Sequence, residues 1–289
     1  MQPRPWIPVL TLLFSATFWG LVWYPLRALE AMGLSGIWQT LASYATALVI
    51  ALPLFHRGEP WRRYGVDLFV LALASGWCNL AFVLAMLDGT VVRVLLLFYL
   101  SPVWAVLFGR WLLGERISGR FFMLLALAMT GTVLMLWDPA LEHPWPSDRA
   151  DWLALSSGAT FALSNVMVRR LRSMSLVAKT LTAWAGVIAV SAGAICLTAP
   201  AFPEAPAGAW AGVVLLGVFG FFFATFAVQY GVTHLPVQRS SVVLLFELVV
   251  GALSASLLAG EALTTREWLG GLLILGAGYA VARGRGDFR

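Results

Sequence analysis

The chain alternates between long apolar segments and short polar breaks, and this alternation predicts its secondary structure. A helix needs roughly 20 mainly apolar residues to cross the hydrocarbon core of a bilayer. Dividing the chain at its charges and at its Pro and Gly breaks gives ten candidate spanning helices, five in each half. They are Ile7–Leu26, Ile37–Phe55, Asp67–Leu87, Val92–Leu113, Phe121–Trp137, Asp151–Val168, Thr180–Ala199, Ala209–His234, Ser240–Ala259 and Trp268–Ala282.

One polar break is longer than the others. It is Asp138–Arg149, with the sequence DPALEHPWPSDR, and it falls between the fifth and sixth candidate helices. We therefore predict two units of five helices each, residues 1–137 and 151–289, joined by a linker at 138–150.

The two units carry a repeated pattern. The stretch 95–120, in which an apolar run is closed by Gly114-Glu115, recurs 146 positions later as 241–266, in which the apolar run is closed by Gly260-Glu261. Each unit has an odd number of helices, so the second enters the membrane from the opposite side. Inverted repeats of this kind are typical of alternating-access transporters. The predicted fold class is an all-α membrane protein with ten transmembrane helices in two inverted five-helix repeats.

Composition supports a membrane protein, because 60% of the residues are hydrophobic and only 11% are charged. A soluble domain of average composition has about 25% charged residues. The net charge of +5 is better explained by loops that face anionic lipid headgroups than by nucleic-acid binding. The two cysteines, Cys78 and Cys196, both lie in apolar segments, so we expect neither a disulfide nor a metal site. The first apolar run is too long for a signal peptide, and we expect it to remain as the first helix.

Basic residues predict the orientation. With the N-terminus inside, fifteen of the 19 Lys and Arg residues lie in cytoplasmic loops or ends, as the positive-inside rule requires. We expect a multi-pass protein of the bacterial plasma (inner) membrane, with both termini in the cytoplasm.

Glu247 is the sharpest candidate for chemistry, because it is the carboxylate placed deepest inside a predicted helix. At 1.5 Å per residue it lies about 10 Å from the cytoplasmic end, where a lone charge is costly. Three interpretations remain open. Glu247 either carries a proton, binds a substrate ammonium group, or locks the ninth helix through hydrogen bonds.

Pro102 interrupts the fourth helix beside Tyr99 and Ser101. A proline removes one helical hydrogen bond and frees the carbonyl four residues earlier, here that of Phe98. Such a break can be a hinge that moves with a gate and exposes a carbonyl to substrate, or a static kink.

The remaining candidates are polar or aromatic residues at mid-helix and two arginines at helix starts. Buried amides bind a neighbouring helix, water or substrate, and aromatic rings either pack or stack on a substrate. Arg93 and Arg239 start the equivalent helices 4 and 9 and either form gate pairs or snorkel to the interface. The substrate-binding candidates are Trp19, Trp77, Asn79, Tyr99, Ser101, Asn165, Phe223, Phe226, Gln229 and Glu247, and the gate or hinge candidates are Pro102, Arg93 and Arg239.

Enzyme motifs do not occur in the sequence. It has no P-loop and no Gly-x-Ser-x-Gly elbow, and the three histidines, His56, His143 and His234, are widely separated. We expect no catalysis, no cofactor, no metal and no nucleic-acid partner, and we expect a monomer.

The repeated corner resembles the drug/metabolite transporter superfamily, in its ten-helix EamA branch. That family writes helix 4 as Tyr-Leu-x-Pro with an apolar run to Gly-Glu, here Tyr99 to Pro102 and then Gly114-Glu115. Its helix 9 often has Glu-Pro, where this chain has Glu247-Leu248. The resemblance implies export of a small metabolite from the cytoplasm without nucleotide hydrolysis. The abundance of Trp and Phe is similar to that of YddG-type exporters of aromatic and other neutral amino acids.

These arguments predict a secondary transporter that exports a small metabolite, an amino acid, through a cavity between helices 1, 3 and 4 and helices 6, 8 and 9. The driving force would be the proton gradient or the substrate's own gradient. Alternatives are an exporter of drugs, nucleosides or sugar derivatives, a passive metabolite channel, and a lipid-handling enzyme or flippase subunit.

Overall fold

Helices make up nearly all of the described chain. A computed structural model describes residues 6–54, 61, 63–88, 91–115, 118–136, 146, 148–259 and 264–283, and no strand occurs among them. Most of the predicted linker, 138–150, lies outside these residues. The helices group into ten spans: α1 and α2 (Ile7–Leu21, Trp23–Ala31); α3 and η1 (Gly36–Ala51, Leu52–Leu54); α4 (Gly65–Asp88); α5 and α6 (Val91–Phe98, Ser101–Leu113); α7 (Gly119–Leu136); α8 (Arg149–Arg170); α9 (Leu176–Thr198); α10, η2 and α11 (Ala207–Leu215, Leu216–Phe221, Phe222–His234); α12 and α13 (Val237–Leu244, Phe246–Ala259); and α14 (Thr265–Arg283).

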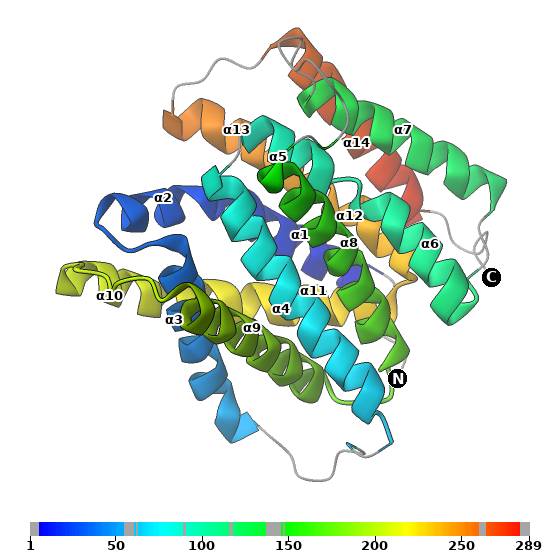
Figure 1. Cartoon of the computed structure of the whole chain (residues 1–289). Coiled ribbons are helices and arrows are strands. Elements are labelled where there is room, and N and C mark those ends of the chain that lie inside the picture. Colours follow the sequence, from blue (N-terminus) through cyan, green and yellow to red (C-terminus); the bar gives the residue numbers. More distant parts are fainter. Residues whose placement is uncertain are drawn as a thin grey trace.

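Length and apolarity confirm the predicted fold class. Among the described residues six continuous helical stretches are long and apolar enough to cross a membrane, and two shorter apolar helices accompany them. Helix α8 is more polar, and it packs against α4, α5, α6 and α11. Figure 1 shows α8 in the middle of the bundle beside α4. A helix that is surrounded by protein does not need a continuous apolar face toward lipid.

Two pairs of helices preserve the 146-residue offset seen in the sequence. Helices α5 and α12 begin 146 residues apart and also end 146 residues apart, and α7 and α14 begin with the same separation. The break after α5 therefore has a counterpart after α12. At both breaks the backbone tightens to i→i+3 bonds, from Leu100 N to Leu97 O and from Leu245 N to Val242 O, each 3.3 Å. The second break forms although the residue after Glu247 is Leu248 and not a proline.

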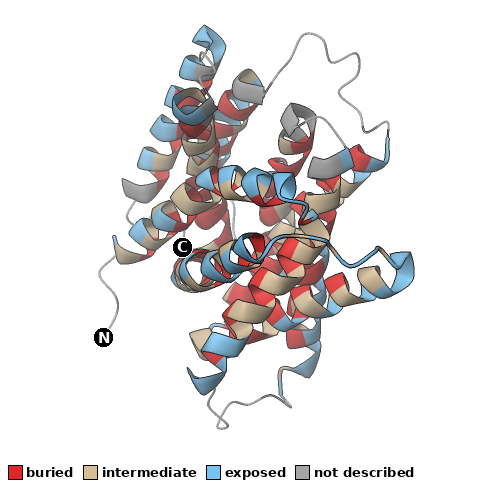
Figure 2. Ribbon diagram, turned by 90° about the vertical axis from the view of Figure 1, so that its left-hand side faces the viewer, coloured by how far each residue is buried: buried red, intermediate tan, exposed pale blue. Residues whose placement is uncertain are grey.

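The helices approach one another most closely at glycines. A Cβ added to Gly186 on α9 would lie 2.0 Å from the Ala72 carbonyl oxygen on α4, and one added to Gly76 would lie 2.5 Å from the Gly186 oxygen. Small residues allow such close approach between membrane helices, where packing drives association. Figure 2 shows the buried residues on the faces that neighbouring helices turn toward each other, and exposed residues on the outward faces.

Arginine and lysine gather at one end of the bundle, which we call the basic end. It is formed by the C-terminal ends of α6 and α8 and by the N-terminal ends of α4, α9 and α12. Its described basic residues include Arg63, Arg110, Arg169, Arg170, Arg172, Lys179 and Arg239.

Candidate functional site

The two broken spans meet at a pair of polar side chains from different halves of the chain. Tyr99 lies in the break between α5 and α6 and is buried, and Glu247 lies in the first turn of α13 and is half-buried. The Tyr99 hydroxyl donates a hydrogen bond to the Glu247 carboxylate. Ser101, which the 146-residue offset makes the counterpart of Glu247, is buried in the first turn of α6. The structure thus brings together Tyr99 and Glu247, two of the residues predicted to bind substrate.

Cys78 on α4 is a second residue of the first half that lies near Glu247. Its thiol lies close enough to Glu247 and to Tyr44 for electrostatic interaction with both. The Ser157 hydroxyl on α8 donates to the Cys78 carbonyl at 2.8 Å. Cys78, which lies near the carboxylate, thus also joins α4 to α8.

The carbonyl freed by Pro102 is covered rather than open. Pro102 lies in the first turn of α6 and is buried. The Phe98 carbonyl packs against Gly158 on α8, where an added Cβ would lie 2.4 Å from its oxygen. In this conformation the Phe98 carbonyl is a packing group for α8 and is not exposed to a substrate.

Helix α1 crosses α13 next to Glu247. A Cβ on Gly20 would lie 2.8 Å from the Glu247 carbonyl oxygen and 2.8 Å from the Cβ of Val250. Farther along α13, the Ser254 hydroxyl donates to the Gly20 carbonyl at 3.1 Å, and the Trp23 indole N–H donates to Ser254 Oγ at 2.9 Å. These contacts fix the depth of α1 against the carboxylate-bearing helix.

An aromatic cluster lies beside this crossing and includes the predicted residue Trp19. The Trp19 and Phe221 ring centroids are 5.2 Å apart, and those of Tyr44 and Phe221 are 4.8 Å apart. Phe221 ends the π-helical turn η2, a geometry that is frequent at functional sites and that shifts the following side chains around the helix. The Tyr44 hydroxyl donates to Asn79 Oδ1 at 2.8 Å. Asn79 is thus held by a side chain of α3, and sequence reasoning missed Tyr44, whose only signal was a tyrosine at the middle of an apolar segment.

The other predicted amides lie in the second half. Asn165 on α8 and Gln229 on α11 are both buried, and Gln229 Oε1 has no hydrogen-bond partner among the described residues. Phe226, one turn before Gln229, packs its ring edge against buried Trp184, with the ring centroids 5.7 Å apart. An amide oxygen buried in this way is available to water or to a substrate donor.

Trp77 and Phe223, which the offset relates to each other, lie on outward-facing rows. Trp77 is 41% exposed and follows exposed Leu73, four residues earlier, on α4. Phe223 is 52% exposed and follows exposed Phe219 in the same way. The Trp77 indole donates to Ser156 Oγ at 3.1 Å. The structure does not bring these two rings together with the Tyr99–Glu247 pair.

The two predicted gate arginines differ in what the structure describes of them. Arg239 on α12 donates from Nη2 to the Val281 carbonyl of α14 at 2.9 Å, so it joins two helices of the same half. Arg93 lies in the first turn of α5, and its side chain is outside the described part of the chain.

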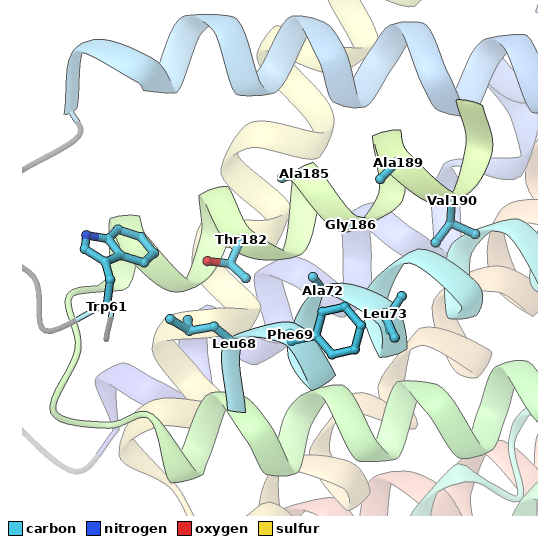
Figure 3. Close-up of a pocket in the computed structure, with 10 residues that line it drawn as sticks. All are labelled: Trp61, Leu68, Phe69, Ala72, Leu73, Thr182, Ala185, Gly186, Ala189 and Val190. Carbon is cyan, nitrogen blue, oxygen red and sulfur yellow. The ribbon is translucent and has the colours of Figure 1, made fainter. Parts of the chain in front are cut away.

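An apolar groove of about 450 Å³ lies elsewhere, between α4 and α9 (Figure 3). Its one side-chain hydroxyl, that of Thr182, already donates to the Ala178 carbonyl at 2.8 Å. The groove therefore suits an apolar chain and offers nothing to a charged metabolite. It is lined by Trp61, Leu68, Phe69, Ala72, Leu73, Thr182, Ala185, Gly186, Ala189 and Val190. Within the described residues no group of three or more His, Cys, Asp or Glu side chains could hold a metal ion.

The fold is that of a multi-pass helical membrane protein. Its site is a Tyr–Glu pair at which two interrupted helices meet. A model of the EamA-like transporter family matches residues 6–137 and again residues 148–283, so the chain belongs to that family. The predicted resemblance to EamA transporters is thereby confirmed, and the family comprises membrane transporters of small molecules.

Known structures agree on the fold. A solved structure titled only "Crystal structure of protein" is 20% identical and superposes with a TM-score of 0.76, covering 94% of this chain and 95% of the other. At that identity the likeness shows the shared fold alone. A search of curated proteins finds no match.

Proposed function

We propose that this transporter exports a small zwitterionic or amphipathic metabolite, an amino acid, by alternating access. The observation that carries the proposal is the hydrogen bond between Tyr99 and Glu247. It places one carboxylate where the broken helices of the two halves meet. Transporters built from inverted repeats bind substrate at such discontinuous helices near the middle of the membrane.

The carboxylate suits an ammonium group. An anion in an apolar environment is costly unless it is paired, and the Tyr99 hydroxyl is a neutral partner that a cation could displace. The aromatic cluster of Trp19, Tyr44 and Phe221 lies on the neighbouring helices. Aromatic faces attract ammonium groups and accept aromatic or aliphatic side chains. Gln229 Oε1 would accept a hydrogen bond from an ammonium or amide N–H of the substrate. The Asn79 amide nitrogen donates one N–H to the Ser75 carbonyl, and its second N–H would donate to a carboxylate of the substrate.

Glu247 can also hold a proton when no cation is bound, and competition between a proton and an ammonium group would couple export to the proton gradient. Without such competition the substrate would move down its own gradient. The basic end, which we place in the cytoplasm with both chain termini, is the side from which substrate would enter.

Transport by purified protein in lipid vesicles tests the proposal. Vesicles loaded with labelled aromatic and aliphatic amino acids, nucleosides or sugar derivatives would be compared over a range of pH for wild type, Glu247→Gln and the control Glu30→Gln. Glu30 is an exposed carboxylate on α2, so its variant should match wild type.

We expect Glu247→Gln to lose most amino acid transport and its dependence on pH. A folded Glu247→Gln protein with the rate and pH profile of wild type would contradict a role in either substrate or proton binding. Transport that neither saturates nor accelerates with substrate on the opposite side would indicate a channel instead.

A further inference from the structure

We propose that Arg170 and Glu115 are positioning residues that hold the two halves together at the basic end, so that the resting protein is closed there. We call their contacts the basic-end clamp: Arg170 with Asp67 and Leu112, and Glu115 with Val237 and Gln238. The inference rests on the proposed alternating access, which requires one end to close while the other opens.

Arg170, near the C-terminal end of α8, reaches two helices of the first half. Its Nε lies 3.1 Å from Asp67 Oδ1 in the first turn of α4. Its Nη1 donates to the Leu112 carbonyl near the C-terminal end of α6 at 3.1 Å. The last carbonyls of a helix lack helical partners and carry partial negative charge. One guanidinium therefore neutralises a carboxylate and caps a helix, both across the boundary between the halves.

Glu115 makes the converse contact, from the first half to the second. It follows Gly114, whose φ of 68° ends α6. Its Oε1 accepts from the Val237 N–H at 3.3 Å, and its carboxylate also accepts from the Gln238 N–H, so it caps the N-terminus of α12. Burial raises the pKa of the Glu115 carboxyl, while the Val237 N–H and the nearby Arg169 guanidinium lower it.

The turn between α11 and α12 is also held from within the second half. Arg169 Nη1 donates to the Thr233 carbonyl at 2.6 Å, and the ammonium group of fully buried Lys179 donates to the Thr233 hydroxyl. These bonds connect α8 and α9 to the turn before α12, so the second-half elements that the clamp contacts are also held to one another. Opening the basic end must break their contacts with the first half.

The opposite end differs from the basic end in the residues at the equivalent positions. The positions 146 residues before Arg169 and Arg170 are Trp23 and Tyr24, which carry no charge. The described ion pair there, Arg149 with Asp88, is 4.0 Å long, with side chains 74% and 45% exposed. Exposed pairs of this kind contribute little.

Distances between spin labels across the basic end test the clamp. Both natural cysteines, Cys78 and Cys196, are replaced by alanine, and labels are attached at Arg110→Cys on α6 and His234→Cys on α11, both exposed positions. Pulsed electron resonance in nanodiscs, without substrate, then gives the ratio of open to closed molecules. The variants are Arg170→Ala, Asp67→Ala and Glu115→Ala, with Asp88→Asn as the control at the opposite end.

We expect each clamp variant to add a longer distance and to raise the open-to-closed ratio by about two- to fivefold, the shift that follows from losing one partly exposed charged contact. The control should keep the single short distance of the parent protein. The exchanged pair Asp67→Arg with Arg170→Asp should recover much of the closed population.

An unchanged distance distribution in Arg170→Ala and Asp67→Ala would overturn the clamp. The readout needs no substrate and is therefore independent of transport. Clamp variants that open, in a protein that moves none of the tested metabolites, would overturn the proposed function and support the clamp.

Discussion

Substituting Gly158 by alanine tests the packing that supports the break at Pro102. A Cβ at position 158 would lie 2.4 Å from the Phe98 carbonyl oxygen and 3.1 Å from the Phe98 carbonyl carbon and Cα. Ordinary contacts of a Cβ begin near 3.4 Å, so helix α8 or the end of α5 must move by about 1 Å. The obstacle is backbone, and it cannot rotate away as a long side chain could.

The expected change in stability combines two opposing effects. Overpacking typically costs about 1–3 kcal/mol, whereas alanine is favoured over glycine inside a helix by about 1 kcal/mol. Gly158→Ala should therefore lower the free energy of unfolding by about 0–2 kcal/mol. Gly193 on α9 is the matched control, because a Cβ there meets no atom within 4 Å. Gly193→Ala should gain up to about 1 kcal/mol.

Thermal unfolding of both variants in the same detergent gives the comparison. The Gly193→Ala protein should unfold at a higher temperature than wild type, and the Gly158→Ala protein at a lower temperature than Gly193→Ala. If the two proteins unfold at the same temperature, α8 is not packed tightly on the Phe98 carbonyl and the reasoning is refuted.

Three further outcomes follow from the site and the basic end. Burial raises the pKa of Glu115 above its usual 4.5 in the folded protein, so the folded state keeps the Glu115 proton to a higher pH than the unfolded state does. Stability should therefore fall as the pH rises from 4.5 through the raised pKa. Glu115→Gln should reduce that slope in unfolding measured against pH, and an unchanged slope would contradict it. Gly20→Ala should displace α13, because the added Cβ would lie 2.8 Å from the Glu247 carbonyl oxygen, and should lower both the transport rate and the unfolding temperature. A variant that unfolds at the wild-type temperature and transports at the wild-type rate would show that the position of Glu247 relative to α1 is not critical. Trp19→Ala should impair export of aromatic substrates while Trp77→Ala leaves it normal, and the reverse result would place the substrate beside Trp77.

The sequence predicts the number and order of the helices and their approximate bounds. Apolar segments, divided at charges and at Pro and Gly breaks, locate ten spans, because lipid permits little besides helices. The 146-residue offset relates the segment around Tyr99 to the segment around Glu247, and the structure joins these two residues. The break beside Glu247 could not be predicted, because Leu248 stands there in place of a proline. Family membership also follows from the motifs around Pro102 and Gly114-Glu115.

The contacts between helices could not be read from the sequence. Which face α4 turns inward depends on its rotation against α8 and α9, and this rotation sets Trp77 on an outward row. The partner of Asn79 is Tyr44 because α3 packs beside α4, and the partner of Arg170 is Asp67, 103 residues away. The π-helical turn that ends at Phe221 has no recognisable signal in the sequence. It lies where Gly217 packs closely on α3 and Gly220 packs closely on α1, and these contacts depend on the tertiary fold.

The two breaks differ in reversibility. At the first, the imino ring of Pro102 permanently removes a donor, so that part of the fourth span cannot rewind into an unbroken helix. At the second, Leu248 retains its N–H, which now donates to Leu245 O at 3.1 Å and could return to the carbonyl of Leu244. The ninth span can therefore straighten, and straightening would rotate Glu247 away from Tyr99. Of the two equivalent breaks, the one at Pro102 is therefore permanent, and the one before Leu248 can be reversed by re-forming a helical hydrogen bond.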